Sequence, residues 1–293
     1  MGKKGKKAQA GKPKKLTPKD VGKRLNALAK NLEEELEGAD LFAPLPPTED
    51  CAVCLVPLPY VNSEVCYQIC CGNRICWSCF NENWESVKKQ NEEKNAGKKI
   101  SFACPFCREP VPTSDDGDEV ESAWLQARCL KNDHIALKLM GGHYLSGTLH
   151  TPKDELKALD YFIRAVELGS PEACLFIASC YREGKGVTIN KERAAFFYRI
   201  GALRGDVAAR HDIGFTEYNF GNHEIGIRHW KIAAEAGDQD SLDALKKIYN
   251  ADSKWPGKEF ISKKCMDSLF RVCHDAQEEV KTEEREKHRS EEK

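Results

Sequence analysis

The sequence has no run of about 20 consecutive apolar residues, which is the length that a membrane-spanning helix requires. It also lacks the pattern of a secretory signal, because no hydrophobic stretch follows the charged first residues, MGKKGKKAQAGKPKK. We therefore expect an intracellular protein, cytoplasmic or nuclear, without a membrane partner. Disulfides are rare in reducing compartments, so the 14 cysteines need another explanation.

Net charge is nearly absent, −1 over 293 residues, but this value hides two tails of opposite sign. Residues 1–24 hold ten lysines and arginines against one acid, and residues 275–293 hold eight acids against five basic residues. Residues 1–16 are too polar to build a core and are expected to be disordered. We interpret them as a solubilising tail, with a nuclear-import signal as the alternative. No aromatic residue alternates with these lysines, which argues against nucleic-acid binding.

Residues 17–50 are expected to form an amphipathic helix followed by a proline-rich linker. Thr17 and Pro18 have the features of a helix N-terminus, and Gly38 is a suitable stop. Docking of this helix on the folded body is the favoured role, with pairing to another helix as the alternative. Its apolar stripe, at spacings of three and four, consists of Val21, Leu25, Leu28, Leu32 and Leu36.

Nine of the 14 cysteines are concentrated between Cys51 and Cys107. They include three Cys-x2-Cys pairs, a spacing that turns two sulfurs toward one metal ion. Zinc takes four such ligands in a tetrahedron. The pattern therefore predicts two bound zinc ions, the alternative being buried unpaired thiols. Outside the cluster, Cys174 and Cys180 are expected to be packed thiols.

The segment 51–108 resembles a RING finger. CGNRICWSC (71–79) is similar to the central phrase of that family, C-G-H-x-x-C-x-x-C, and CPFCR (104–108) matches its closing knuckle. The resemblance implies a cross-brace, in which the first and third pairs of ligands share one zinc ion. The ligands implied for this ion are Cys51, Cys54, Cys76 and Cys79.

The second zinc ion would take Cys104, Cys107 and two ligands from the region around Asn73, which replaces the family histidine. Asparagine is a poor zinc ligand compared with imidazole. We therefore assign the remaining positions to Cys70 and Cys71, with Cys66 as the alternative to Cys70.

RING fingers have no nucleophile and form no covalent intermediate, so the resemblance implies no catalytic residue in this chain. Members of the family hold an E2 ubiquitin-conjugating enzyme and fix its ubiquitin thioester in a reactive pose, a gain from positioning. By resemblance, Leu55, Trp84 and Pro105 would contact the E2. Arg108 would contact both the E2 and ubiquitin.

From residue 133 the sequence repeats with a period near 36–37. YREGKGVTINKERAAFFY (181–198) resembles a Sel1-like repeat, a family that stacks helix pairs into a curved solenoid suited to binding proteins. The third copy shortens its loop to FGNHE, and a degenerate fourth unit at 241–271 is expected to cap the array. The equivalent positions are Ala136, Ala173 and Ala209, then Tyr144, Tyr181 and Tyr218, and then the helix-ending glycines Gly169, Gly205 and Gly237.

Together these patterns predict a mainly α protein, with a small two-zinc cross-brace RING finger followed by an α-solenoid of Sel1-like helical repeats. The finger occupies 51–108, a linker 109–132, the repeats 133–271 and a charged tail 272–293. The resemblances imply a RING-type E3 ubiquitin ligase, with an E2 on the finger and a protein substrate on the solenoid. The alternative is a non-catalytic scaffold protein whose finger is purely structural.

Overall fold

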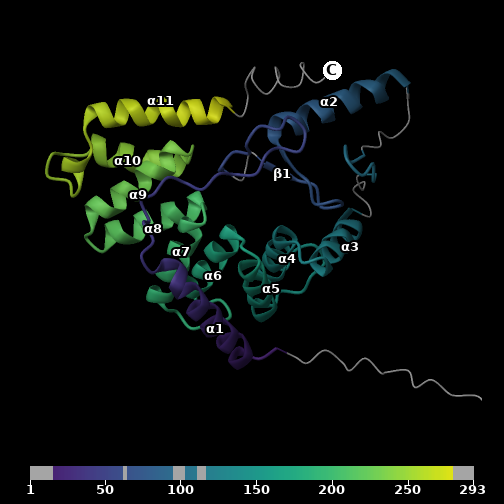
Figure 1. The fold of residues 1–293 in the computed structure, drawn as a ribbon, viewed down its shortest axis with the longest axis horizontal. Helices are drawn as coiled ribbons and strands as arrows, with labels where there is room; N and C mark the ends of the chain where they lie inside the picture. Colours follow the sequence, from purple (N-terminus) through teal and green to yellow (C-terminus); the bar gives the residue numbers. More distant parts are fainter. Residues whose placement is uncertain (1–15, 62–64, 95–102, 111–116, 280–293) are drawn as a thin grey trace, which may run out of the picture.

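The computed structural model describes residues 16–61, 65–94, 103–110 and 117–279. A first helix leads into a small cysteine-rich finger and then into a row of helices. Figure 1 shows α3 to α11 following one another along a curve, with the finger to one side. Most of the predicted basic tail and the end of the charged tail lie outside the described residues.

The finger contains β1 (Val65–Tyr67), β2 (Arg74–Cys76) and α2 (Trp77–Lys94). Among the described helices, none combines the length and apolar character that crossing a bilayer requires. The remaining elements are α1 (Pro18–Leu36), α3 (Gly117–Leu130), α4 (His134–Ser146), α5 (Glu155–Glu167), α6 (Pro171–Glu183), α7 (Lys191–Leu203), α8 (Val207–Asn219), α9 (His223–Glu235), α10 (Gln239–Asn250), the short 3-10 helix η2 (Lys258–Phe260) and α11 (Lys263–Glu279).

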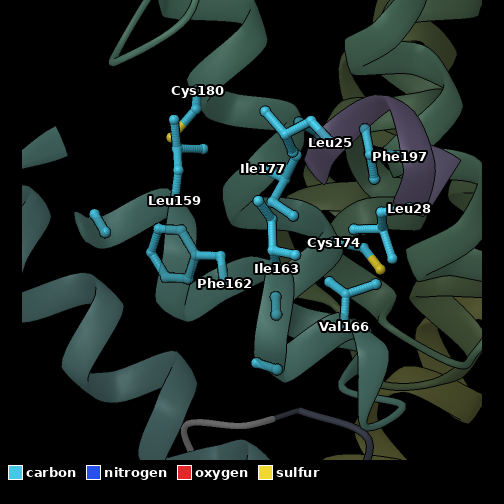
Figure 2. Close-up of a cluster of buried hydrophobic side chains, with 14 of the residues drawn as sticks. Leu25, Leu28, Leu159, Phe162, Ile163, Val166, Cys174, Ile177, Cys180 and Phe197 are labelled. Carbon is cyan, nitrogen blue, oxygen red and sulfur yellow. The ribbon is translucent and has the colours of Figure 1, made fainter. Parts of the chain in front are cut away.

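Helix α1 begins where the sequence predicts, and it docks on the helical repeats. The Thr17 side chain caps it by accepting a hydrogen bond from the N–H of Asp20, and Pro18 is its first residue. Its apolar stripe packs against α5 and α7 and is buried except for Leu36, and Figure 2 shows Leu25 and Leu28 among side chains of the repeats. The predicted docking is therefore confirmed.

Two ion pairs flank this buried stripe and join residues far apart in the chain. Arg24 pairs with Asp160 on α5. The guanidinium of Arg204, at the end of α7, donates to both carboxylate oxygens of Glu35, each over 2.8 Å. Because the Arg204 pair is bidentate, it fixes the direction of α1 as well as its position.

The repeats consist of three antiparallel helix pairs, α4 with α5, α6 with α7 and α8 with α9. A Gly-Ser or Gly-Asp dipeptide ends one pair and begins the next. Gly169 and Gly205 adopt the left-handed conformation, with φ of 91° and 96°. The following residues, Ser170 and Asp206, cap α6 and α8 through their side chains. The prediction that glycines end the second helices is confirmed.

An aromatic pair fills the space within each helix pair. In the third repeat, Tyr218 and Trp230 each lie one residue further from the N-cap of their helix than the equivalent residues of the first two repeats. Because both are shifted by the same amount, the two rings still meet. The predicted equivalence of the three tyrosines is therefore confirmed. The ring-centroid distances are 5.5 Å for Tyr144–Tyr161, 5.9 Å for Tyr181–Phe197 and 5.2 Å for Tyr218–Trp230.

Further helices cover both ends of the repeat array. Within the segment 109–132, which we expected to be a linker, α3 buries Leu125 and Cys129 in the same core as the first repeats. At the other end, α10 and α11 pack on α9 around a second core. Helix α11 continues to Glu279, beyond the expected end of the repeats. Both additions cover the apolar face that an end repeat would otherwise expose.

Candidate metal centres

The finger has a small core of its own, separate from the cores of the repeats. Leu58 and Ile75 are buried there together with four cysteines. The two strands pair antiparallel, with Cys66 opposite Ile75, and α2 follows β2 directly. So small a core leaves most of the fold to be stabilised by other means, as is usual for domains of this size.

One group of four cysteines lies in this core. Cys51 and Cys54 come from the first knuckle, Cys76 ends β2 and Cys79 lies in the first turn of α2. All four are buried, and their sulfur atoms lie within 4.8 Å of one another. The Sγ atoms of Cys54 and Cys76 are 4.0 Å apart.

A second group of four cysteines lies at the other end of the hairpin. Cys70 and Cys71 lie on the turn between β1 and β2, and Cys104 and Cys107 form the closing knuckle. Their sulfurs also lie within 4.8 Å of one another. Cys71 and Cys104 are separated by 3.7 Å between Sγ atoms, and Cys70 and Cys107 by 3.5 Å.

Both groups have the size of a zinc–thiolate tetrahedron. With zinc–sulfur bonds of about 2.3 Å, the sulfurs of a regular tetrahedron are separated by about 3.8 Å. The observed separations of 3.5, 3.7 and 4.0 Å lie close to this value. The eight cysteines therefore form two tetrads that could each hold one metal ion, and the donor set suits zinc.

The electrostatics of the tetrads also favour a cation. Closely packed thiols resist ionising together, because each thiolate repels the next. Hydrogen bonds from Cys76 and Cys79 lower the pKa of the Cys51 thiol, whereas the hydrogen bonds to Cys51 and Cys76 raise the pKa of Cys79. Burial raises the pKa of Cys70 in the second tetrad. A divalent cation would stabilise all the thiolates at once.

Asn73 and Cys66 lie near the second tetrad in sequence but are not members of it. Asn73 donates a hydrogen bond from Nδ2 to the Sγ of Cys71 over 3.3 Å, so it supports a sulfur of the tetrad. Cys66 lies on β1 and packs against the finger core, where burial raises its pKa to about 11. Its thiol is therefore protonated at neutral pH, as expected for a packed cysteine.

The two knuckles share one backbone pattern. In each, the N–H of the first cysteine donates to the carbonyl of the residue five positions later. The N–H of the residue after the second cysteine donates to the carbonyl of the first cysteine over 3.0 Å. That last residue is Leu55 in one knuckle and Arg108 in the other, with φ of 57° and 60°. Both side chains are exposed. The fold therefore presents these two predicted E2 contacts at equivalent points.

The other two predicted E2 contacts lie together on the finger. Trp84 on α2 and Pro105 in the closing knuckle line one cavity of about 240 Å³. Leu55 and Arg108 are not among the described residues that line it. Trp84 stacks with Phe80, with ring centroids 6.2 Å apart.

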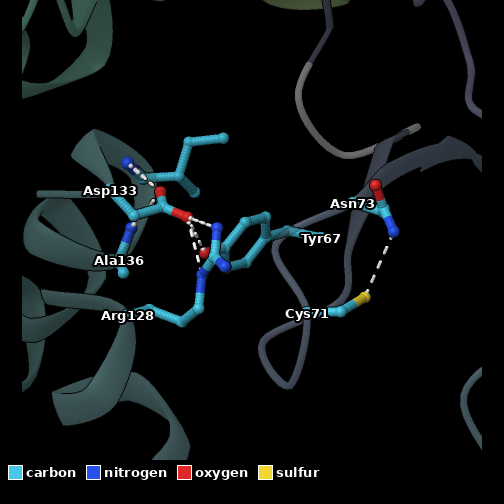
Figure 3. A network of polar contacts seen from close by, with 7 residues as sticks. Tyr67, Cys71, Asn73, Arg128, Asp133 and Ala136 are labelled. Carbon is cyan, nitrogen blue, oxygen red and sulfur yellow. Dashed lines mark hydrogen bonds and ion pairs between the residues drawn. The ribbon is translucent and has the colours of Figure 1, made fainter. Parts of the chain in front are cut away.

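A polar network joins the finger to the repeats (Figure 3). Asp133 Oδ1 caps α4 by accepting from the N–H of Ala136, and Oδ2 accepts from the Tyr67 hydroxyl over 2.7 Å. Arg128 at the end of α3 donates to the same oxygen. Burial alone would raise the pKa of Asp133, but these hydrogen bonds lower it overall. Sequence reasoning missed this contact, because no local pattern links residues so far apart.

The assignment of the second tetrad leads to a prediction about zinc content. Cys70→Ser is expected to reduce the bound zinc from two ions per chain to one, because an oxygen replaces a thiolate and opens the tetrahedron. Cys66→Ser is the matched control and should retain both ions, since this thiol lies outside the tetrads. Elemental analysis of the purified proteins measures the difference. Zinc loss in the Cys66 variant alone would show that Cys66, and not Cys70, is the ligand.

Two solved structures and one repeat family are similar to this chain. The chain is 27% identical to a Sel1 repeat protein from Oxalobacter formigenes, over 56% of this chain and 66% of that one, with a TM-score of 0.48. It is 20% identical to c5321, a protective antigen of uropathogenic Escherichia coli with an SLR fold, over 66% of this chain and 40% of that one, with a TM-score of 0.47. The curated proteins give no match. The Sel1 repeat family matches residues 134–170, 171–206 and 212–238, the part of the chain that forms the helix pairs α4 to α9.

Proposed function

We propose that this protein is a RING-type E3 ubiquitin ligase that acts in the cytoplasm or nucleus. In this proposal the finger holds an E2 ubiquitin-conjugating enzyme and the Sel1 repeats bind a protein substrate. Two zinc ions hold the finger in shape and take no part in ubiquitin transfer. The division of labour follows the division of the chain, with the finger at 51–108 and the repeats beginning at 133.

The observation that carries the proposal is the alternation of the two tetrads along the chain. The first tetrad takes its sulfurs from the first and third segments of the finger, and the second takes them from the second and fourth. This is the cross-brace order that the resemblance to RING fingers implies. Many other arrangements of these cysteines would also give two tetrads, so the order itself is informative.

Three exposed side chains of the finger support an E2 as the partner. Leu55 and Arg108 are exposed at equivalent points after the two knuckles, and Trp84 is 38% exposed on α2. An exposed leucine, tryptophan and arginine suit a protein partner, because aromatic and arginine side chains contribute most to binding energy. None of these side chains is a ligand of either tetrad.

A non-catalytic scaffold is the second candidate, and one observation favours it. The finger is tied to the repeats through Tyr67, Arg128 and Asp133, which suits a purely structural role for the finger. In that case the Sel1 repeats alone would carry the function by binding proteins. The scaffold and ligase proposals differ in one measurable property, the discharge of ubiquitin from an E2.

Discharge of ubiquitin from a charged E2 onto free lysine tests the ligase proposal. We expect Arg108→Ala and Leu55→Ala each to lower the discharge rate by about tenfold, equivalent to ~1.4 kcal/mol. Both residues already have a left-handed backbone, and alanine keeps the Cβ. The variants therefore change the side chain without relieving backbone strain.

The controls for this test lie on other parts of the surface. Arg271→Ala removes an exposed arginine from α11, and Leu168→Ala removes a leucine that is 45% exposed at the end of α5. Both should discharge ubiquitin at the parental rate, and all variants should retain two zinc ions. An inactive parent across a panel of E2 enzymes would favour the scaffold. An active parent with unchanged Arg108 and Leu55 variants would show that the E2 binds elsewhere.

A further inference from the structure

The cavity beside the second tetrad has walls from two parts of the chain. Trp84 of α2 and Pro105 of the closing knuckle form one side, and Glu121 and Trp124 of α3 form the other. Its volume is about 240 Å³, and most of its exposed lining is apolar. A cavity between two tryptophans on separate elements is suited to receiving a large apolar side chain of a partner.

Helix α3 is fixed in place by contacts on its other faces. Leu125, the neighbour of Trp124, is completely buried in the core of the repeats, and Cys129 is buried beside it. At the end of the helix, Arg128 binds Asp133 in the network that also holds Tyr67 of the finger. The wall that α3 contributes is therefore preorganised, and a partner would not have to order it on binding.

The charges around the cavity have one sign. Glu109 and Glu121 are among its lining residues, and none of the described lining residues is a lysine or arginine. An acidic rim attracts a cation on the partner and repels a carboxylate. The lining therefore fits a partner segment that presents a large apolar side chain next to a lysine or arginine.

We propose that α3 forms part of the E2-docking surface and selects E2 enzymes whose docked loop pairs a large apolar side chain with a basic residue. This inference rests on the proposed ligase function. It adds a wall that the finger alone does not supply, since α3 belongs to the core of the repeats. The apolar side chain lies between Trp84 and Trp124, and the basic residue lies beside Glu121.

Titration of the full-length, zinc-loaded protein with a panel of E2 enzymes tests this surface. Trp124→Ala is expected to weaken E2 binding by about tenfold or more, as for an aromatic side chain in the middle of an interface. Trp124→Phe should restore most of the affinity, because it keeps an aromatic wall. Retained zinc and an unchanged unfolding midpoint distinguish a lost contact from lost folding.

Reversing the charge of Glu121 provides a second, independent variant, because this side chain is not part of the buried core. Glu121→Lys is expected to weaken E2 binding by about three- to tenfold, with a larger effect at low salt than at high salt. Glu119→Lys is the matched control, since it makes the same change at an exposed position of α3 outside the cavity. It should leave the affinity within about twofold of the parent.

The outcomes separate this inference from the ligase proposal. A parent that binds no E2 and discharges no ubiquitin would overturn both. A parent that loses discharge with Arg108→Ala, yet binds E2 equally well with Trp124→Ala and Glu121→Lys, would overturn only the role of α3. Tighter E2 binding by Trp124→Ala would also overturn it, because α3 would then obstruct the E2. Weaker binding by both variants with an unchanged Glu119 control supports the inference.

Discussion

Cys51→Ser is expected to unfold the finger and leave the helical repeats folded. A structural zinc site contributes an apparent binding free energy of ~10–16 kcal/mol, which far exceeds what the few apolar side chains of the finger supply. The core of the finger is separate from the cores of the repeats, so its loss removes few contacts from the helices. Bound zinc should fall from two ions per chain to one or fewer, while the far-ultraviolet circular dichroism of the helices changes little.

Cys174→Ser is the reciprocal control for this experiment. Cys174 is completely buried in the core of the repeats, and burial raises its pKa to about 12, so it is a packed thiol as the sequence predicts. Its replacement by serine should lower the free energy of unfolding of the repeats by about 1–3 kcal/mol and leave both zinc ions bound. Loss of the helical signal in the Cys51 variant would mean that finger and repeats fold as one unit.

Phe162→Ala is expected to destabilise the repeats by about 3–5 kcal/mol. Phe162 on α5 is completely buried (Figure 2). It stacks on Phe176 of α6, with ring centroids 4.9 Å apart. A Cβ added at Gly141 of α4 would overlap the same ring, so the ring fills the space between three helices. Alanine leaves a cavity that these helices cannot close. Urea unfolding followed by the helical circular dichroism signal measures the loss.

Phe215→Ala is the matched control, because it removes the same ring from α8 at a position that is 57% exposed. Its expected effect is within about 0.5 kcal/mol of the parent. Equal destabilisation by the two substitutions would contradict the assignment of Phe162 to the central core. It would also show that α8 uses its outer face in packing.

The parts of the fold that the sequence predicted depend on local signals. Thr17 and Pro18 begin a helix through contacts within one turn, and Gly169 and Gly205 end helices because each needs a left-handed conformation. The period of the repeats is also local, since each unit packs on the next. The Cys-x2-Cys pairs are local in the same way, because each places two sulfurs on one ion within a single turn, so their spacing was enough to suggest two metal ions.

The contacts that the sequence left open join residues far apart. Tyr67 meets Asp133 across 66 positions, and nothing near either residue marks the pair. We expected a linker where α3 lies because the sequence PTSDDGDEV (112–120) is acidic and rich in turn-forming residues. The buried Leu125 and Cys129 lie four residues apart, as do Val120 and Trp124, and this helical spacing could have identified the helix. The cavity between Trp84 and Trp124 depends on how two modules dock, which spacing does not encode.

The position of α1 sets an order of events during synthesis. In a simple repeat array each unit contacts only its neighbours and can fold as soon as it is made. Here Arg24 pairs with a residue 136 positions later, and Glu35 with one 169 positions later. At 5–20 residues per second, α1 waits roughly 10–30 seconds for its binding surface. During that interval its apolar stripe is available to chaperones, and its late docking joins the first two repeats into one cooperative unit.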